Sequence, residues 1–330
     1  MKAIILTGEA GKATCVNDRP RPRLRPGYLL VDVKAVALNP TDHKHIDTWN
    51  HKGLLSGCDF AGLVSQLGSG YSKEWKVGDR ICGFAHGANE LEAEDGAFAE
   101  QIVVKADIGL RFPDNMPFDE AATLGVGVIT VGQALFMQMG LSRPVPNSPL
   151  PTSGELILIY GGSSATGSIA IQFAKLAGLT PIAVCSRHNF EFVKSYIGRD
   201  RKLKYVFDTV STTTTAEFCG QLIAPRGLWA YVLLGTKFPR DDVETIYPLA
   251  YLSVGERVKK GSDEFPASSR NLEFVSEWML LAEQLLEKGF LKAHPRQVEG
   301  GLENVINGFE LMRGGKVSGR KLVYTVEGEL

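Results

Sequence analysis

The stretch Leu156-Ile157-Leu158-Ile159-Tyr160-Gly161-Gly162-Ser163-Ser164-Ala165-Thr166-Gly167 decides the fold of this chain. Its first five residues form an unbroken apolar run, which is typical of a strand buried on both faces. Small residues follow at once, and then an apolar helical periodicity at Ile169, Phe173 and Leu176. Small residues let the backbone approach phosphates, and a helix N-terminus offers free N–H groups and a positive dipole.

This strand–turn–helix predicts that Ser163, Ser164, Ala165 and Thr166 hold the pyrophosphate of a dinucleotide. The turn departs from G-x-G-x-x-G, because Ser164 and Ala165 stand where glycines are usual. An ordinary strand–helix turn can carry the same small residues. The strands that follow in the chain favour the dinucleotide interpretation.

The bulk composition narrows the class of protein. The chain has 330 residues, enough for two domains, with 44% hydrophobic residues and a net charge of −1. This charge balance gives no reason to expect a nucleic acid or an anionic membrane surface as partner. The apolar run Met1–Leu6 is too short for a signal peptide, and no stretch reaches the roughly 18 to 20 apolar residues of a membrane span. We therefore expect neither a nucleic-acid nor a membrane partner.

Five cysteines lie far apart in the chain, and their odd number argues against a disulfide framework. A reducing compartment fits this usage best. We expect a cytoplasmic protein.

The first part of the chain, to about residue 110, is rich in short strands. The segments 28–38, 57–68, 77–84 and 96–104 each combine a β-type apolar run with turn residues at its ends. Several short strands at this spacing predict a small barrel-like domain.

The later part alternates strands and helices. Buried-strand patterns occur at 180–185, 205–210 and 229–234, with a helical pattern at 211–222 between the last two. This alternation predicts an open parallel sheet. Helices are expected at about 118–139, 271–286 and 302–312, and a last strand at 321–326.

Several motifs, taken in order, resemble the medium-chain dehydrogenase/reductase superfamily. They are Gly57-Cys58-Asp59-Phe60-Ala61-Gly62, Val77-Gly78-Asp79-Arg80, Gly96-Ala97-Phe98-Ala99-Glu100 and Ser318-Gly319-Arg320-Lys321-Leu322-Val323. The resemblance implies an α/β protein that joins a GroES-like β-barrel domain, 1–120 with 270–330, to a Rossmann-type doubly wound parallel sheet domain, 121–269.

Within the superfamily, the chain is most similar to fungal trans-acting enoyl reductases that serve highly reducing polyketide synthases. This likeness rests on Asn39-Pro40-Thr41-Asp42-His43-Lys44, on Tyr160–Thr166 and on Cys185-Ser186-Arg187-His188-Asn189-Phe190. It implies that hydride moves from NADPH to the β-carbon of an enoyl thioester held by an acyl carrier domain. We expect the protein to act as a monomer.

No zinc site is expected. Cys58-Asp59-Phe60 occupies the place of the Gly-His-Glu signature of zinc-dependent relatives, and the other cysteines have no C-x-x-C spacing. His43 and His45, two residues apart, indicate a surface pair rather than a metal site.

The residues after the second parallel strand favour NADPH over NADH. An Asp or Glu here would bind the ribose 2′-hydroxyl of NAD and repel a 2′-phosphate. This chain has Ser186, Arg187, His188 and Asn189 instead, and Arg187 with Ser186 can pair with a phosphate. Arg187 as an ordinary solvated side chain at a strand end is the alternative.

The resemblance also implies roles for individual residues. Lys44 is the candidate that stabilises the enolate oxygen, and Thr41 donates a hydroxyl hydrogen bond; a solvent-facing loop lysine is the alternative for Lys44. The other residues implied to contact the cofactor are Pro40, Asp42, His43, Thr130, Leu234, Gly235, Val317 and Ser318. Those implied to line the acyl chain are Ala122, Thr123, Leu124, Gly125, Val126, Gly127, Val128, Ala250, Tyr251, Leu252, Ser253 and Val254, although ordinary core is an equal alternative for each.

The chain departs from the family after Gly198. It runs directly into Arg199-Asp200-Arg201-Lys202 and then Tyr205–Asp208, where relatives carry a third strand, a helix and a cofactor-contacting tyrosine. The helical pattern after Tyr205–Asp208 indicates that this strand is the fourth, which would leave the second strand at a sheet edge. The shortening leaves open two other functions, namely reduction of quinones or small free enones and a non-redox role in binding or shaping a polyketide.

Overall fold

The computed structural model describes residues 1–49, 51–185 and 202–326. These residues form two compact units, each described below by itself. Unit 1 comprises Met1–Ile129, Tyr251–Glu287 and Ala293–Leu330, and unit 2 comprises Thr130–Ala250 with Lys288–Lys292. Residues 121–129 and 251–269 thus belong to unit 1, whereas the resemblance implied that they lie in the second domain. For 251–269 the reason is a hairpin within this segment that packs its side chains into unit 1.

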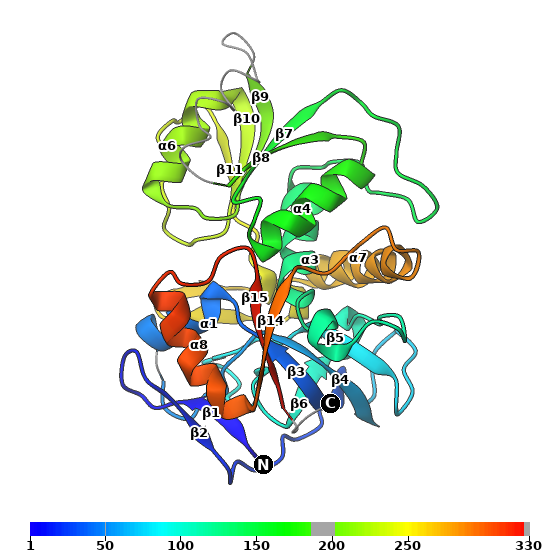
Figure 1. Ribbon diagram of the computed structural model, residues 1–330, viewed down its shortest axis with the longest axis vertical. Helices are drawn as coiled ribbons and strands as arrows, with labels where there is room; N and C mark the ends of the chain where they lie inside the picture. The colour runs from blue at the N-terminus through cyan, green and yellow to red at the C-terminus, as the bar shows by residue number, and fades with distance from the viewer. Residues whose placement is uncertain (50, 186–201, 327–330) are drawn as a thin grey trace. The chain divides into compact units, whose positions relative to one another are not determined.

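The main sheet of unit 1 has the strand order β14-β15-β3-β4-β5, with β6 also paired to β3 (Figure 1). Its longest strand, β3 (Tyr28–Ala37), is buried along most of its length, as its nearly continuous apolar sequence predicts. The others are β4 (Asp59–Leu67), β5 (Arg80–Phe84), β6 (Gln101–Lys105), β14 (Arg296–Gly300) and β15 (Lys321–Thr325). The strands expected at 28–38, 57–68, 77–84 and 321–326 are confirmed.

One expected strand of unit 1 is shorter than its pattern indicates. The segment 96–104 becomes a strand only from Gln101, because Ala97 and Phe98 donate their N–H groups to the loop carbonyls of Gly57 and Ser56, at 2.9 Å each. The strand β14 was not expected, since its sequence Arg296-Gln297-Val298-Glu299-Gly300 is largely polar.

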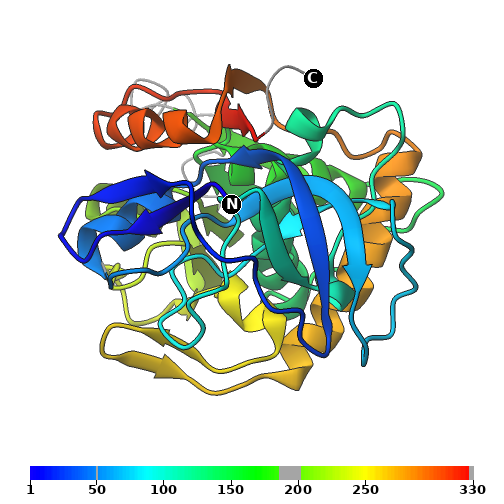
Figure 2. The ribbon, with the colours of Figure 1, turned by 90° about the horizontal axis from the view of Figure 1, so that it is seen from below.

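A hairpin and two helices accompany the main sheet of unit 1. The hairpin β1 (Ala3–Leu6) with β2 (Ala13–Val16) lies beside α8 (Val305–Arg313), as Figure 2 shows. The helix α1 (Pro40–Thr48) begins directly after β3, and a short 3-10 turn, η5 (Leu302–Asn304), precedes α8. Leu6, Val31, Phe60, Phe98 and Phe309 are among the buried side chains of the core of this unit.

A long apolar helical segment runs from α2 (Phe118–Ala121) through α3 (Gly125–Val131) into the π-helical stretch η2 (Gly132–Gln138). The 21 residues from Phe118 to Gln138 are apolar enough to cross a membrane, but 83% of the most apolar window is buried inside the protein. A buried helix is what the sequence predicted here, and the segment belongs to the core. The helix α7 (Ser269–Glu287) packs in unit 1, where the Trp278 indole donates to the carbonyl of Val128 at 2.9 Å.

The segment between the last strand of unit 2 and α7 carries a turn and a hairpin that the sequence analysis did not identify. The turn is the 3-10 helix η4 (Ala250–Val254), and the hairpin pairs β12 (Val258–Lys260) with β13 (Asp263–Phe265). In β12 the side chains of Val258 and Lys260 are both buried, so a lysine takes an inward position of the strand.

Unit 2 is built on a five-stranded sheet in the order β11-β10-β9-β7-β8, with all neighbours parallel. The strands are β7 (Leu156–Tyr160), β8 (Thr180–Val184), β9 (Leu203–Asp208), β10 (Ile223–Tyr231) and β11 (Glu244–Ile246). The helix α4 (Ala165–Leu176) connects β7 to β8, and α6 (Thr213–Leu222) connects β9 to β10. The two connections run in opposite directions along the sheet, so right-handed crossovers place α4 and α6 on opposite faces (Figure 1). The doubly wound parallel sheet is confirmed.

The order of strands also confirms the interpretation of Tyr205–Asp208. Strand β9 pairs directly with β7, and β8 is the edge strand among the described residues of this sheet. The strand expected at 229–234 begins earlier and ends at Tyr231. It ends there because Val232 donates its N–H to the hydroxyl of Ser211, at 2.8 Å, instead of to a neighbouring strand.

Candidate functional site

The turn after β7 in unit 2 brings the backbone close to its neighbours at three glycines. Gly161 has a positive φ of 81°, and a Cβ at this residue would lie 2.5 Å from the hydroxyl of Thr209. A Cβ at Gly162 would meet Cβ of Ala183 at 2.8 Å, and one at Gly167 would meet the carbonyl oxygen of Gly161 at 2.2 Å. Only glycine fits these three positions, so the helix α4 starts immediately beside the end of the strand.

Ser164 caps the N-terminus of α4. Its hydroxyl accepts a hydrogen bond from the N–H of Gly167 at 3.0 Å and contacts the Thr209 hydroxyl at 2.9 Å. Ser163 is exposed, and in the described part of the chain the N–H groups of Ala165 and Thr166 have no acceptor. The exposed start of a twelve-residue helix therefore presents free N–H groups and a positive dipole, which suits the phosphates of a dinucleotide.

The other residues expected to contact a cofactor in unit 2 lie in different settings. Leu234 and Gly235 form the turn after β10, and Thr130 is buried near the start of the unit. Ser186, Arg187, His188 and Asn189, which are expected to contact a 2′-phosphate, lie outside the described residues. Thr209, which directly follows β9, contacts the turn after β7: its hydroxyl donates to the carbonyl of Tyr160 at 2.8 Å, and the sequence analysis did not single it out.

A buried ion pair fixes the start of α1 in unit 1. The Lys321 ammonium pairs with the carboxylate of Asp59 and donates to the side-chain oxygen of Asn39 at 3.0 Å. Asn39 in turn donates its side-chain N–H to Asp59 at 2.9 Å, and Val126 donates its backbone N–H to the same carboxylate at 2.7 Å. Strands β4 and β15 and the segment at α3 thereby hold the residue that precedes Pro40.

The residues Asn39–Lys44 lie at the start of α1, and their side chains differ in how far they are buried. Thr41 is half-buried, and its hydroxyl lies 2.7 Å from the Tyr251 hydroxyl. Asp42 is fully buried and accepts from the N–H of Asn39 at 2.7 Å; burial raises its pKa to about 7, although this hydrogen bond opposes the shift. The side chain of His43 is only 14% exposed, and its Nδ1 lies 3.2 Å from the carboxylate of Asp47.

Lys44 is half-buried, and burial lowers the pKa of its ammonium. Among the described residues, no hydrogen-bond or ion-pair partner contacts this ammonium.

The expectation that His43 and His45 form a surface pair is wrong for His45. Its imidazole is only 2% exposed and lies in a polar cluster inside unit 1. Its Nε2 lies 3.1 Å from the hydroxyls of Thr41 and Tyr251 and 3.0 Å from the ammonium of Lys260. The four-residue spacing of Thr41 and His45 puts both on the inner face of α1, a signal present in the sequence once α1 is treated as a helix.

The same cluster contains Cys58, His86 and Lys260, none of which the sequence analysis assigned a role in a site. The Cys58 thiol lies 3.8 Å from the Tyr251 hydroxyl, and the His86 ring lies 4.6 Å from the Tyr251 ring. Burial holds the pKa of both imidazoles, His45 and His86, well below the usual range and raises the pKa of the Cys58 thiol and the Tyr251 hydroxyl. Burial also lowers the pKa of Lys260 to about 8.

Most residues expected to line an acyl chain are buried in the core. Ala122, Thr123, Leu124 and Val128 have no measurable exposure, and Val126 is partly exposed. A Cβ at Gly125 would lie 2.2 Å from the carbonyl oxygen of Gly83, so this glycine permits close helix–strand packing. Of the second group, Tyr251 joins the polar cluster and Leu252 is partly exposed, while Ala250, Ser253 and Val254 are buried.

Two further expected cofactor residues, Val317 and Ser318, lie in the segment between α8 and β15 of unit 1, where Val317 is partly buried and Ser318 exposed.

Across the described ranges 1–49, 51–185 and 202–326, no group of three or more His, Cys, Asp or Glu side chains could hold a metal ion.

Comparisons with known proteins identify a domain within unit 1 and the fold of the chain. Residues 25–114 match the model of the alcohol dehydrogenase GroES-like domain. Similar structures include an alcohol dehydrogenase superfamily protein from Novosphingobium aromaticivorans, with a TM-score of 0.77 at 20% identity, covering 98% of this chain and 100% of that one. The CurK enoyl reductase aligns with a TM-score of 0.70 at 21% identity, covering 99% of each chain. At these identities the structural likeness establishes the fold alone, which is the α/β fold of the medium-chain dehydrogenases/reductases.

Sequence relatives define the family more narrowly. The trans-enoyl reductase resD of Aspergillus sclerotiorum is 42% identical over 358 aligned positions, covering 99% of this chain and 100% of the relative. The trans-enoyl reductase TOXD of Cochliobolus carbonum is 44% identical over 271 positions, covering 76% of this chain and 90% of the relative. The chain belongs to the trans-enoyl reductases of fungal polyketide biosynthesis. Because the alignment with resD is longer than the 330 residues of this chain, the relative carries residues that this chain lacks.

Proposed function

We propose that this trans-enoyl reductase uses NADPH to reduce the α,β double bond of a polyketide thioester held on an acyl carrier domain. The observation that supports this proposal most is the strand–turn–helix of 156–176 in a chain of this family. Its glycines let the start of the helix lie close to the end of the strand, and its first N–H groups are free to bind phosphate. The protein acts as a monomer in the cytoplasm, supplying a reduction to a separate synthase.

The turn of unit 2 fits a nicotinamide dinucleotide. Ser163, Ser164, Ala165 and Thr166 would hold the pyrophosphate through backbone N–H groups, and Thr130, Leu234 and Gly235 would contact the rest of the molecule. Ser186 and Arg187, with His188 and Asn189, would hold the 2′-phosphate, because this segment lacks the carboxylate that favours NADH. Bound NADPH supplies the hydride that reaches the β-carbon of the substrate.

Unit 1 supplies charge and protons. When hydride is added to the β-carbon, negative charge develops on the thioester oxygen, and the Lys44 ammonium stabilises it. The partly exposed Thr41, whose hydroxyl lies 2.7 Å from the Tyr251 hydroxyl, would donate the hydrogen bond that orients the reacting groups. Pro40 and His43, with Val317 and Ser318, would complete the cofactor contacts of this unit. The buried Asp42 would act indirectly, because its carboxylate holds the start of α1 through the N–H of Asn39.

The acyl chain is proposed to lie along apolar residues. These are Ala122–Val128 and Ala250–Val254, of which Val126 and Leu252 have the exposed surface that a ligand could contact. The buried members of both segments would shape the wall from behind. A second function, reduction of quinones or small free enones, shares the same hydride chemistry; a quinone oxidoreductase from Pseudomonas syringae pv. Tomato has the same fold, with a TM-score of 0.68 at 22% identity.

The test compares substrates on purified protein. NADPH oxidation is followed with an enoyl chain on an acyl carrier domain, the same chain on pantetheine, a quinone and a small enone. The proposal expects the highest kcat/KM on the carrier-bound chain. Equal or higher kcat/KM on the free quinone or enone would favour the second function. Absence of binding at millimolar NADPH, in protein shown to be folded, would leave only the non-redox role.

A further inference from the structure

A continuous chain of polar side chains runs through the interior of unit 1. Thr41 Oγ1 lies 2.7 Å from Tyr251 Oη, Tyr251 Oη lies 3.1 Å from His45 Nε2, and His45 Nε2 lies 3.0 Å from Lys260 Nζ. Every separation is a hydrogen-bond distance. The two hydroxyls can each donate and accept, the imidazole nitrogen can do either according to its protonation, and the Lys260 ammonium donates. The four residues come from α1, η4 and β12, so the tertiary fold of unit 1 assembles the chain.

The burial of these groups gives the series of hydrogen-bonded side chains a direction, from the buried Lys260 to the partly exposed Thr41. Tyr251, His45 and Lys260 are all buried, whereas Thr41 is partly exposed. A buried lysine needs compensation, because moving an ammonium away from water is costly. Its compensation here includes the face of the Tyr251 ring, whose centroid lies 3.8 Å from the ammonium.

We propose that Lys260, His45 and Tyr251 form a proton relay that resupplies the Thr41 hydroxyl when this hydroxyl protonates the α-carbon of the reduced substrate. This inference rests on the proposed enoyl reduction. Thr41 is the catalytic residue of the relay, and the other three are positioning residues that act through it.

In the proposed relay, each proton that is given up in one turnover is replaced. The α-carbon of the enolate forms a C–H bond with the proton of the Thr41 hydroxyl, and Thr41 takes the hydroxyl proton of Tyr251. Tyr251 is reprotonated from His45 Nε2, which has received a proton from the Lys260 ammonium. Lys260 is left as the neutral amine and regains one proton from solvent. A pKa near 8 lets Lys260 exchange protons in the physiological range.

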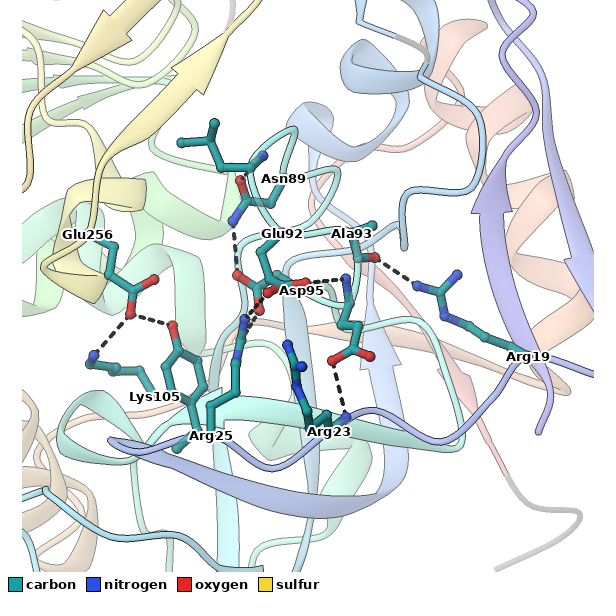
Figure 3. Close-up of polar contacts among 12 residues, drawn as sticks. Arg19, Arg23, Arg25, Asn89, Glu92, Ala93, Asp95, Lys105 and Glu256 are labelled. Atoms are coloured by element: carbon teal, nitrogen blue, oxygen red, sulfur yellow. Dashed lines mark hydrogen bonds and ion pairs between the residues drawn. The ribbon is translucent and has the colours of Figure 1, made fainter.

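The hairpin that carries Lys260 is anchored at two points. Before β12, the Glu256 carboxylate accepts hydrogen bonds from the Tyr28 hydroxyl at 2.7 Å and from Lys105 at 3.1 Å (Figure 3). After β12, the N–H of Gly261 donates to Glu90 at 2.7 Å. Lys260 is therefore held between two anchored residues of the hairpin, Glu256 and Gly261.

The loop that contributes Glu90 is itself fixed to the rest of unit 1. Figure 3 shows that Arg25 pairs with Asp95 and with Glu92, the latter at 2.9 Å, and that Asn89 donates to Asp95 at 2.9 Å. The charge of Glu90 favours the ammonium form of Lys260. This network gives a buried lysine a defined position instead of the freedom of an ordinary surface lysine.

The titratable groups that face Lys260 come from every element packed around it. They are Asp42 and His45 on α1, Cys58 before β4, His86 and Glu90 in the loop after β5, and Tyr251 on η4. Burial keeps the pKa of His45 and His86 well below the usual imidazole range and raises the pKa of Cys58 and Tyr251 well above their usual values. The carboxyl of Asp42, with a pKa of about 7, titrates before Lys260 as the pH rises.

The test uses Lys260→Met and Lys260→Arg in the full-length protein. Methionine fills the space without a proton, and arginine keeps the charge but does not release its proton near neutral pH. We expect kcat for NADPH-dependent reduction to fall on the order of 10²-fold in both variants, with NADPH affinity unchanged. In the unmodified protein kcat should fall as the pH rises above about 8, and both variants should lose this limb.

Lys259→Met is the matched control. Lys259 is the neighbour on the same strand, its side chain is 37% exposed, and its contact with Glu90 is 3.6 Å. This control should retain kcat and the pH limb. If Lys260→Arg retains full activity with the pH limb, Lys260 serves only to place a charge and the relay is wrong.

A second readout does not depend on catalysis. The Nε2 signal of His45, assigned among the six histidines by its loss in His45→Gln, is followed by nitrogen NMR across pH. It should shift with a midpoint near 8 in the unmodified protein and in Lys259→Met, and show no such midpoint in Lys260→Met. The same midpoint in Lys260→Met would overturn the relay. If the unmodified protein shows this midpoint but reduces no enoyl thioester, the proposed reductase function fails while the coupling of Lys260 to His45 stands.

Discussion

The ammonium of Lys260 lies 3.0 Å from Nε2 of His45, although 215 residues separate the two in the chain. Both side chains are buried in unit 1, and His45 is the only described contact between Lys260 and the α1 helix that has hydrogen-bond geometry. The contact links the start of the GroES-like domain, where Thr41 and Lys44 lie, to a hairpin from the C-terminal part of the chain. It provides a physical reason why the segment 251–269 folds with unit 1.

Replacement of Lys44 tests the electrophilic role proposed for it. In Lys44→Met we expect turnover on an enoyl thioester to fall about 10²- to 10³-fold, the typical loss for one donor that stabilises a developing oxyanion. NADPH affinity should change little, because the ammonium acts on the thioester oxygen. Lys52→Met, an exposed lysine of the same unit, is the matched control and should retain turnover. Steady-state kinetics measure turnover in both variants. Equal turnover in Lys44→Met and Lys52→Met would show that Lys44 is an ordinary loop lysine without an electrophilic role.

Replacement of Arg187 tests the proposed preference for NADPH. We expect Arg187→Ala to weaken NADPH binding by about 1.5 to 3 kcal/mol, the range for a hydrogen bond to a charged group, or roughly 10- to 160-fold. NADH lacks the 2′-phosphate, so its affinity should stay the same and serves as the internal control. Calorimetric titration of both cofactors measures the two values. Equal affinities of the unmodified protein for NADPH and NADH would contradict the prediction.

The cap at Ser164 stabilises the turn that is proposed to bind pyrophosphate. Ser164→Ala removes the acceptor for the Gly167 N–H and the contact with Thr209, and should cost about 1 kcal/mol of local stability. Ser164→Thr keeps a hydroxyl cap and should lose much less. Hydrogen–deuterium exchange of the peptide that covers α4 reports this local free energy. Equal exchange in the two variants would show that the hydroxyl does not cap the helix.

The buried Asp42 makes the stability of unit 1 depend on pH. Burial raises its pKa from 3.8 to about 7, so the folded state binds the proton more tightly than the unfolded state. The resulting stabilisation is full below about pH 4 and is lost as the pH rises through about 7. Asp42→Asn should therefore gain stability relative to the unmodified protein over this range, on the order of 1 to 4 kcal/mol at pH 8.

Urea denaturation between pH 4 and 8 measures this gain. Asp47→Asn is the control of opposite sign: partial burial raises the pKa of Asp47, but the hydrogen bonds from Arg313 and His43 lower it overall. Its stability difference from the unmodified protein should become more unfavourable as the pH rises from acid. If Asp42→Asn shows a pH-independent difference, the carboxyl does not titrate as proposed.

The parts of the fold that could be predicted are those whose signals are local. The run Leu156–Tyr160, the small-residue turn and the periodicity of α4 lie within about twenty consecutive residues, and the structure confirms all three. The edge position of β8 also followed from local evidence, because the helical pattern after Tyr205–Asp208 identified this strand as the fourth. Strand ends were less accurate, since hydrogen bonds to distant groups, such as that from Val232 to Ser211, decide where pairing stops.

The polar cluster of unit 1 could be predicted only in part. Thr41, Asp42 and Tyr251 were named from the resemblance, but the contacts among them depend on three segments that meet only in the folded unit. His45 was assigned to the surface because its two-residue spacing from His43 was considered without the helix. Lys260 had no local signal, since a lysine in a polar segment is normally exposed; burial in β12 results from the pairing with β13 and the contacts of Glu256 and Glu90.

Transfer of hydride to the substrate tests the central claim most directly. The purified protein is incubated with an enoyl-pantetheine thioester and NADPH that carries deuterium at C4 of the nicotinamide, prepared separately for each face. Mass spectrometry and NMR of the product then locate the label. The proposed function predicts a saturated thioester with one deuterium at the β-carbon, from one of the two labelled cofactors. A folded protein that binds NADPH yet gives no saturated product, or gives product without deuterium from either cofactor, would contradict it.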